Sequence, residues 1–135
     1  MFDGCNNLTS IDISNFNTKY VTEMSHLFYR CYSLKSIDLS NFNNEKVRFM
    51  EGIFEDCHSL TSLNIYNFNT ENITKINYMF YDCPKLEFLN ISGFVYDKNV
   101  SLFYDLPQFG TLIVNNDFIE IINNQIPPEW EIKIK

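Results

Sequence analysis

Four cysteines are the residues of this chain whose spacing bears most directly on possible chemistry. Cys5, Cys31, Cys57 and Cys83 follow one another at intervals of 26 residues. Thiolates can bind zinc or form disulfides, but zinc sites favour pairs such as Cys-x-x-Cys, which the sequence lacks. In a later, shorter unit the same position is held by Leu106, as expected for a small buried hydrophobe. Because equivalent side chains point the same way, we predict free, buried thiols in preference to a disulfide or a metal site.

The other reactive side chains give little support for catalysis. His26 and His58 fall in different columns of the repeat, and neither has a nucleophile placed beside it, so we expect two surface residues. Asp56, Asp82 and Asp105 form an acidic column just before the cysteine position. Stacked carboxylates could hold Ca²⁺, but such residues more often cap turns by accepting from backbone N–H groups. We therefore predict no enzyme activity, no cofactor and no metal.

A period of 26 residues defines the elements that carry these side chains. Each unit reads Phe-x-x-Cys-x-x-Leu-x-x-Ile-x-Ile-Ser-Asn-Phe-Asn, and its middle is the strand signature of leucine-rich repeats. Ile11 and Ile13 alternate with polar residues, as in a strand with one buried face. Val21, Met24 and Phe28 then follow a helical spacing.

These patterns predict an α/β solenoid, a right-handed coil of leucine-rich-repeat type. It would contain one parallel sheet of about six short strands, with short helical returns on the opposite side.

The chain divides into three parts within one continuous domain. Residues 1–94 hold four regular units, the first truncated at its start, so we expect a fragment of a longer protein. Residues 95–116 form a degenerate fifth unit, whose Phe109 aligns with Leu86 after a shift of 23. Residues 117–135 begin with a possible capping box, Asp117 to Glu120, and end as a lysine-bearing edge strand. This last part predicts a cap helix followed by a sixth strand.

Composition narrows the possible partners. The net charge is −7 and the pI is about 4.7, which argues against nucleic-acid binding because that needs a basic surface. No apolar run approaches the roughly 18 residues that a membrane span requires. We expect a protein partner, no nucleic acid, no direct membrane span and a monomer within a longer chain.

The outward-facing positions of the sheet are the best candidate for a binding surface. Small polar residues fill most of them, but Tyr66, Phe88 and Ile113 are apolar. Exposed apolar side chains among polar ones suggest a contact patch, although the repeat copies could also have drifted without selection. The predicted partner-binding residues are Asp12, Asp38, Asn64, Tyr66, Phe88, Asn90 and Ile113.

Two segments carry a resemblance to a known family. They are Leu-Thr-Ser-Ile-Asp-Ile-Ser-Asn-Phe-Asn-Thr-Lys-Tyr-Val-Thr-Glu-Met (8–24) and Met-Phe-Tyr-Asp-Cys-Pro-Lys-Leu-Glu-Phe-Leu-Asn-Ile-Ser (79–92). Both resemble BspA-type leucine-rich repeats, and the match covers residues 1 to 94. The resemblance implies a cell-surface or extracellular location and a role in adhesion to host or matrix proteins. The alternative is a structural spacer or stalk within a larger surface protein.

Overall fold

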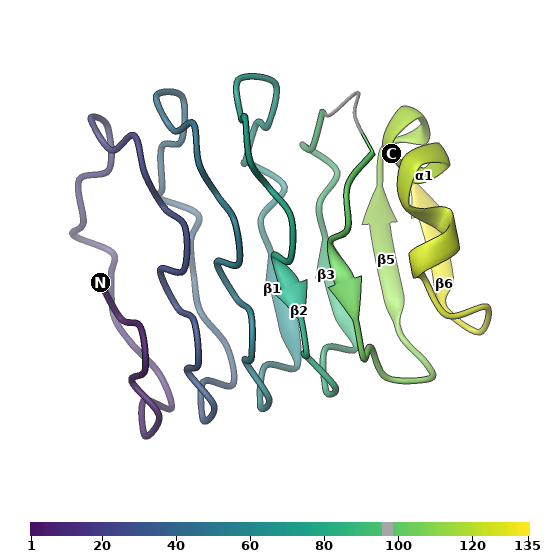
Figure 1. Cartoon of the computed structure of the whole chain (residues 1–135), viewed down its shortest axis with the longest axis horizontal. Helices are drawn as coiled ribbons and strands as arrows, with labels where there is room; N and C mark the ends of the chain where they lie inside the picture. The colour runs from purple at the N-terminus through teal and green to yellow at the C-terminus, as the bar shows by residue number, and fades with distance from the viewer. Residues whose placement is uncertain (96–98) are drawn as a thin grey trace.

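The computed structural model describes residues 1–95 and 99–135, and its main element is a four-stranded parallel sheet. The strands lie in the order β1-β3-β5-β6, so that each is bonded to the strand of a neighbouring unit (Figure 1). Their bounds are β1 Ser62–Asn64, β3 Phe88–Asn90, β5 Thr111–Val114 and β6 Glu131–Ile134. Leu89 is paired with Leu63 on one side and Leu112 on the other. This register confirms the predicted alignment of the strand positions.

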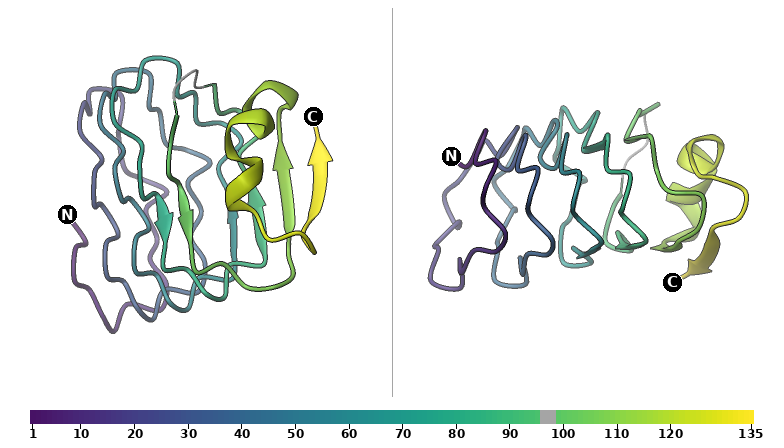
Figure 2. Two further views of the ribbon diagram at one scale, coloured as in Figure 1. Left: turned by 45° about the vertical axis from the view of Figure 1, so that its right-hand side comes forward. Right: turned by 90° about the horizontal axis from the view of Figure 1, so that it is seen from below.

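The remaining elements are short. β2 (Phe80–Tyr81) pairs in parallel with β4 (Phe103–Tyr104), and α1 (Asn116–Ile122) continues into a 3-10 turn, η1 (Asn123–Gln125). The fold is therefore α/β, built mostly from parallel strands with few short helices. The units lie side by side, with the two termini at opposite ends of the row (Figure 2). No helix of the described residues has the length and apolar character needed to cross a membrane.

The main sheet has fewer strands than the six that the sequence predicts. In the described residues, segments 10–14 and 36–40 form no regular strand. Lys35 donates its backbone N–H to the Thr9 carbonyl at 3.3 Å, but the amide of Asn41 binds the carbonyls of Ile13 and Ser14. The first two units therefore adjoin through single backbone and side-chain hydrogen bonds, without forming a regular sheet.

The prediction of helical returns is wrong. Within each return only isolated turns form, such as Leu27 N–H to Met24 O at 3.3 Å, while alternate N–H groups donate to the next unit, as Met24 does to Phe49 O at 2.9 Å. Residues with positive φ also interrupt each return, in two columns. A right-handed helix has no place for positive φ. The two columns are His26, Gly52, Tyr78 and Gly4, Arg30, Asp56, Asp82, Asp105.

The helix α1 begins earlier than the sequence predicts. Its N-cap is Asn115, whose side chain accepts from the Phe118 N–H at 2.8 Å, so the Asp117 capping box does not start it. Phe118 and Ile122 are buried and close this end of the core. The expected fifth unit includes residues 96–98, which lie outside the described residues.

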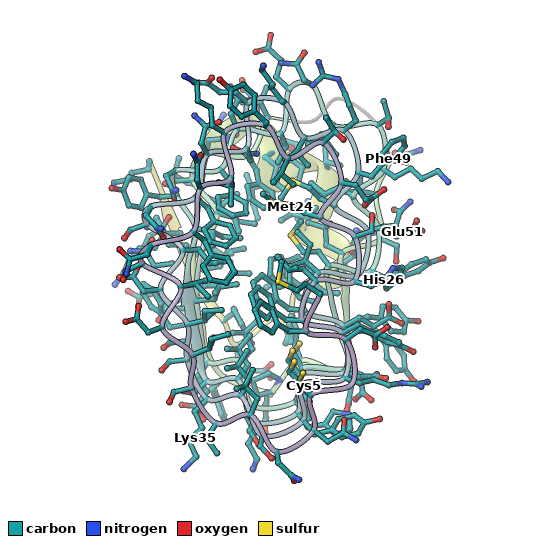
Figure 3. All side chains as sticks on the ribbon, turned by 90° about the vertical axis from the view of Figure 1, so that its left-hand side faces the viewer. Cys5, Met24, His26, Lys35, Phe49 and Glu51 are labelled. Carbon is teal, nitrogen blue, oxygen red and sulfur yellow. The ribbon has the colours of Figure 1, made fainter. Side chains whose placement is uncertain are left out.

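A column of stacked phenylalanines runs through the core. Ring centroids are 5.5 Å apart from Phe28 to Phe54 and 6.1 Å apart from Phe54 to Phe80, with nearly parallel planes. Phe2 and Phe103 extend the column at either end, each at 5.4 Å from its neighbour. Seen along the row of units, apolar side chains fill the space between the sheet and the returns (Figure 3). Each ring is buried only by its neighbours, so stability depends on unit-to-unit contact.

Replacing Phe54 by Ala should test this dependence. Phe54 is fully buried between two rings, and its truncation should lower the free energy of unfolding by about 3 to 5 kcal/mol. The control is Phe109→Ala, which removes a ring that is 62% exposed and should change stability by no more than about 0.5 kcal/mol. Urea unfolding measures both. Equal losses would contradict a core built from this column.

Candidate functional site

The three apolar residues predicted on the sheet face surround one position. Phe88 precedes Asn90 by two residues on β3, and Ile113 is the register partner of Asn90 on β5. On the other side, Asn90 pairs with Asn64, two residues before Tyr66. Neighbouring and diagonal positions of this kind lie about 5 to 8 Å apart. Tyr66, Phe88 and Ile113 therefore lie around Asn90 and are here called the apolar patch; along the strand direction Tyr66 and Phe88 are four residues, or about 13 Å, apart.

The members of this apolar patch differ in exposure. Tyr66 is 53% exposed, whereas Phe88 and Ile113 are half-buried. Asn64, also predicted as a contact residue, is exposed on β1. The patch thus combines a projecting phenol with two partly accessible apolar side chains, an arrangement suited to contact with another protein.

The expectation that Asn90 is exposed is wrong. Only 6% of this residue is accessible. Its Oδ1 accepts from the Ser92 N–H at 3.1 Å. Asn90 therefore holds the turn after β3 and contributes little surface to a partner.

Asp12 and Asp38 have a local structural role. Asp12 Oδ1 accepts from the Ser14 N–H at 3.0 Å, and Asp38 Oδ1 from the Ser40 N–H at 2.9 Å. The hydroxyl and backbone N–H of Ser14 lower the pKa of Asp12, and the backbone N–H and hydroxyl of Ser40 do the same for Asp38. Both lie in the first two units, away from the apolar patch. Their predicted role in binding stays a prediction.

A hollow of about 530 Å³ opens at the beginning of strands β3, β5 and β6. Glu87, Phe109, Glu129 and Glu131 line it, and Phe109 is 62% exposed. The strand register keeps the shift of 23 that aligns Phe109 with Leu86, but Phe109 does not share the burial of Leu86. Trp130, which is buried beside Gly110, fills this end of the core instead. A Cβ at Gly110 would lie 2.6 Å from the Trp130 ring, so only glycine fits there.

On the opposite side of the molecule, the structure joins a histidine to the acidic column. Asp56, His58 and Asp82 bring one ligand atom each within 4.8 Å of one another. His58 Nε2 lies 3.0 Å from Asp82 Oδ2, while Arg30 Nε lies 3.4 Å from Asp56 Oδ2. Arg30 compensates the charge of Asp56, and His58 forms a hydrogen bond with Asp82. The positive φ of Asp56, Asp82 and Asp105 explains the column as a turn position that suits Asp.

The returns also carry an aromatic row that sequence reasoning missed. The rings of Tyr81 and Tyr104 stack at 4.7 Å, and Tyr78 meets Tyr81 edge-on at 5.3 Å. Tyr32 stacks on His58 at 4.7 Å. The signal in the sequence is the interval of 23 between Tyr81 and Tyr104, the same shift that relates the fourth and fifth units.

The cysteine column lies inside the core, as predicted for Cys31, Cys57 and Cys83, while Cys5 is half-buried. Each buried Sγ lies close to a phenylalanine carbonyl of the preceding unit: Cys57 Sγ is 3.2 Å from Phe28 O. Burial raises the pKa of these three thiols. A thiol with a raised pKa is a poor nucleophile at neutral pH, so the column serves packing.

Comparison with family models gives one match. A model described as a Mycoplasma protein of unknown function, DUF285, matches residues 1–115. The chain belongs to the DUF285 family. The match spans the regular units and β5 but ends before α1, so the cap helix and β6 of this DUF285 protein lie beyond it. Comparison with curated proteins and with solved structures yields no match.

The buried thiols of this DUF285 protein should make its stability depend on alkaline pH. Burial, with a smaller contribution from Cys5, raises the pKa of the Cys31 thiol from 9.0 to about 11. The unfolded chain then loses this proton at a lower pH than the folded protein does. The stabilisation is complete below pH 9 and is lost as the pH rises from 9 to about 11.

Urea unfolding between pH 8 and 11 measures this effect. The Cys31→Ala variant should show a shallower fall in unfolding free energy with pH than the wild type, because one linked proton is removed. Leu106→Ala is the matched control, because it truncates the same column of the repeat without removing a thiol, and it should keep the wild-type slope. An unchanged slope in Cys31→Ala would show that this thiol is not linked to folding.

Proposed function

We propose that this DUF285 protein is a leucine-rich-repeat-like solenoid that acts as a non-catalytic protein-binding module. Its binding surface would be the exposed face of the main sheet, and its role adhesion at a cell surface. The surface location and adhesion rest on the resemblance to BspA-type repeats, because the family description gives no function.

The observation that carries the proposal is the apolar patch of Tyr66, Phe88 and Ile113. The side chains of the recurring apolar columns are buried in contacts between units, as Phe28, Phe54 and Phe80 show. The three patch residues recur in no column and lie on the outer face. Aromatic side chains are enriched among the residues that dominate protein–protein binding.

The repeated backbone bonds support the solenoid part of the proposal. The N–H groups of Met24, His26, Phe28 and Arg30 each donate to the carbonyl found 25 residues later in the sequence. The same offset recurs from Met50, Gly52, Phe54 and Asp56 to the third unit. Each unit therefore meets the next through the same contacts, which is the arrangement of a repeat array.

The alternative function is a structural spacer, whose repeats would join other parts of a larger surface protein. The bonds between neighbouring units that support the solenoid would serve a spacer as well as a binding module.

Binding experiments with two matched double variants should separate these functions. Tyr66→Ser with Phe88→Ser removes the patch and should abolish retention on any matrix protein that binds the wild type. Tyr20→Ser with Phe49→Ser is the control, because it also removes one exposed Tyr and one exposed Phe, both outside the sheet. Pull-down with a panel of purified extracellular-matrix proteins provides the readout, and circular dichroism verifies folding.

Three outcomes are informative. Loss of binding in the patch variant alone supports recognition through the sheet face. Equal retention of both variants by a partner would place binding elsewhere and overturn this assignment. Retention of no panel member by the wild type favours the spacer.

A further inference from the structure

The hollow at the beginning of β3, β5 and β6 continues the sheet face that carries the apolar patch. Phe88 is paired with Thr111, and Thr111 in turn with Glu131, so the three side chains form one row across the sheet. Thr111 and Glu131 line the hollow, as does Glu87, the residue before Phe88. A partner that covers Phe88 therefore reaches the hollow without leaving the same surface.

The charge of the hollow is negative. Glu87, Glu129 and Glu131 line it and are exposed, and their charges add to the net −7 of the chain. Among the described residues, the ion pairs supply one cation here, Lys133, whose Nζ lies 3.2 Å from Glu131 Oε2. Like charges around one hollow repel one another, and a cation placed between them relieves that repulsion.

The spacing of the carboxylates favours an extended cation over a metal ion. In the part of the chain that the structure describes, three ligating side chains come within 4.8 Å of one another only at Asp56, His58 and Asp82. The three glutamates of the hollow do not all lie within 4.8 Å of one another. A guanidinium or ammonium group on a flexible side chain can pair with carboxylates that are too far apart to coordinate one metal ion.

An apolar wall completes the hollow. Phe109 is 62% exposed and Pro107 lies beside it, while the buried Trp130 lies directly behind Gly110. An exposed aromatic ring next to carboxylates suits an arginine, which can form an ion pair and stack on the ring at the same time. A hydrophobic neighbour of that arginine would then lie towards Phe88.

We infer that the protein partner presents a basic segment with an adjacent hydrophobic residue, and that this segment binds in the glutamate-lined hollow. The inference rests on the proposed function, because it specifies which partner the sheet face takes. In this mode of binding, electrostatic attraction in the hollow adds to the apolar contact at Phe88. Binding should therefore be selective for arginine and lysine and should weaken as the salt concentration rises.

The single tryptophan of the chain provides a local probe. Trp130 Nε1 donates to the Pro107 carbonyl at 2.8 Å, and Pro107 lines the hollow. The tripeptide acetyl-Arg-Phe-Arg-amide should change the Trp130 fluorescence in a saturable manner, and acetyl-Glu-Phe-Glu-amide should not. Isothermal titration calorimetry with the same two peptides gives a readout that does not depend on Trp130.

Paired variants test the role of the carboxylates. Glu87→Gln with Glu129→Gln keeps the shape of the hollow and should weaken binding of the arginine peptide about fivefold to tenfold. Glu45→Gln with Glu71→Gln is the control, since these glutamates are exposed but lie outside the hollow, and affinity should be unchanged. If the two peptides bind equally, or if the first pair of substitutions leaves affinity unchanged, the inference is overturned.

The two proposals fail in different ways. In the matrix-protein assay, one result is that a partner is lost by the Tyr66→Ser and Phe88→Ser variant but fully retained by the Glu87→Gln and Glu129→Gln variant. That result would sustain the sheet-face function and overturn the basic segment. Loss in both variants supports the two together. Retention of the partner by both variants would overturn both proposals, whereas loss in the Glu87→Gln and Glu129→Gln variant alone would sustain the basic segment and overturn the role of Tyr66 and Phe88.

Discussion

Contact between each unit and the next is the interaction on which the structure depends. No unit can bury its own apolar face, so Phe54 is covered only because Phe28 and Phe80 lie on either side of it. The backbone shows the same dependence, since alternate N–H groups of the returns donate to the following unit. Every position that faces a neighbour must therefore hold the same kind of residue in each unit. A residue that breaks its column is free of this requirement and can serve a partner.

The turns of the returns impose a second constraint. Two positions per unit take positive φ, where glycine is unstrained and aspartate is tolerated better than most other residues. This explains why Gly4 and Asp56 share one column and why Gly52 and His26 share the other. It also explains why aspartate recurs in this column. The carboxylates of Asp56 and Asp82 then meet Arg30 and His58 across neighbouring units.

The repeat made part of the fold predictable. Columns of Leu and Cys predicted the strand register and the buried thiols, because recurrence reports contact with a neighbour. The returns were misread because Val21, Met24 and Phe28 share a helical spacing that successive turns also produce, and the glycines at 4 and 52 were the signal of positive φ. The hollow could not be predicted, because Phe109 keeps the register of Leu86 but not its burial, and Trp130 fills this end of the core in its place. Asn90 could be placed on the outer face, but its low exposure could not be read from its position in the repeat.

In a fold of this kind, we expect functional residues at positions where the residue type changes from one unit to the next. The first two units carry their acidic side chains in local turns, so Asp12 and Asp38 already have hydrogen-bond partners within the chain. The aromatic and glutamate side chains of the sheet face appear only from the third unit onward, where the sheet becomes regular and the hollow opens. A surface with both an apolar patch and uncompensated carboxylates can discriminate between partners by charge as well as by shape. Since these residues take no part in the stacking of units, they can change the partner without changing the fold.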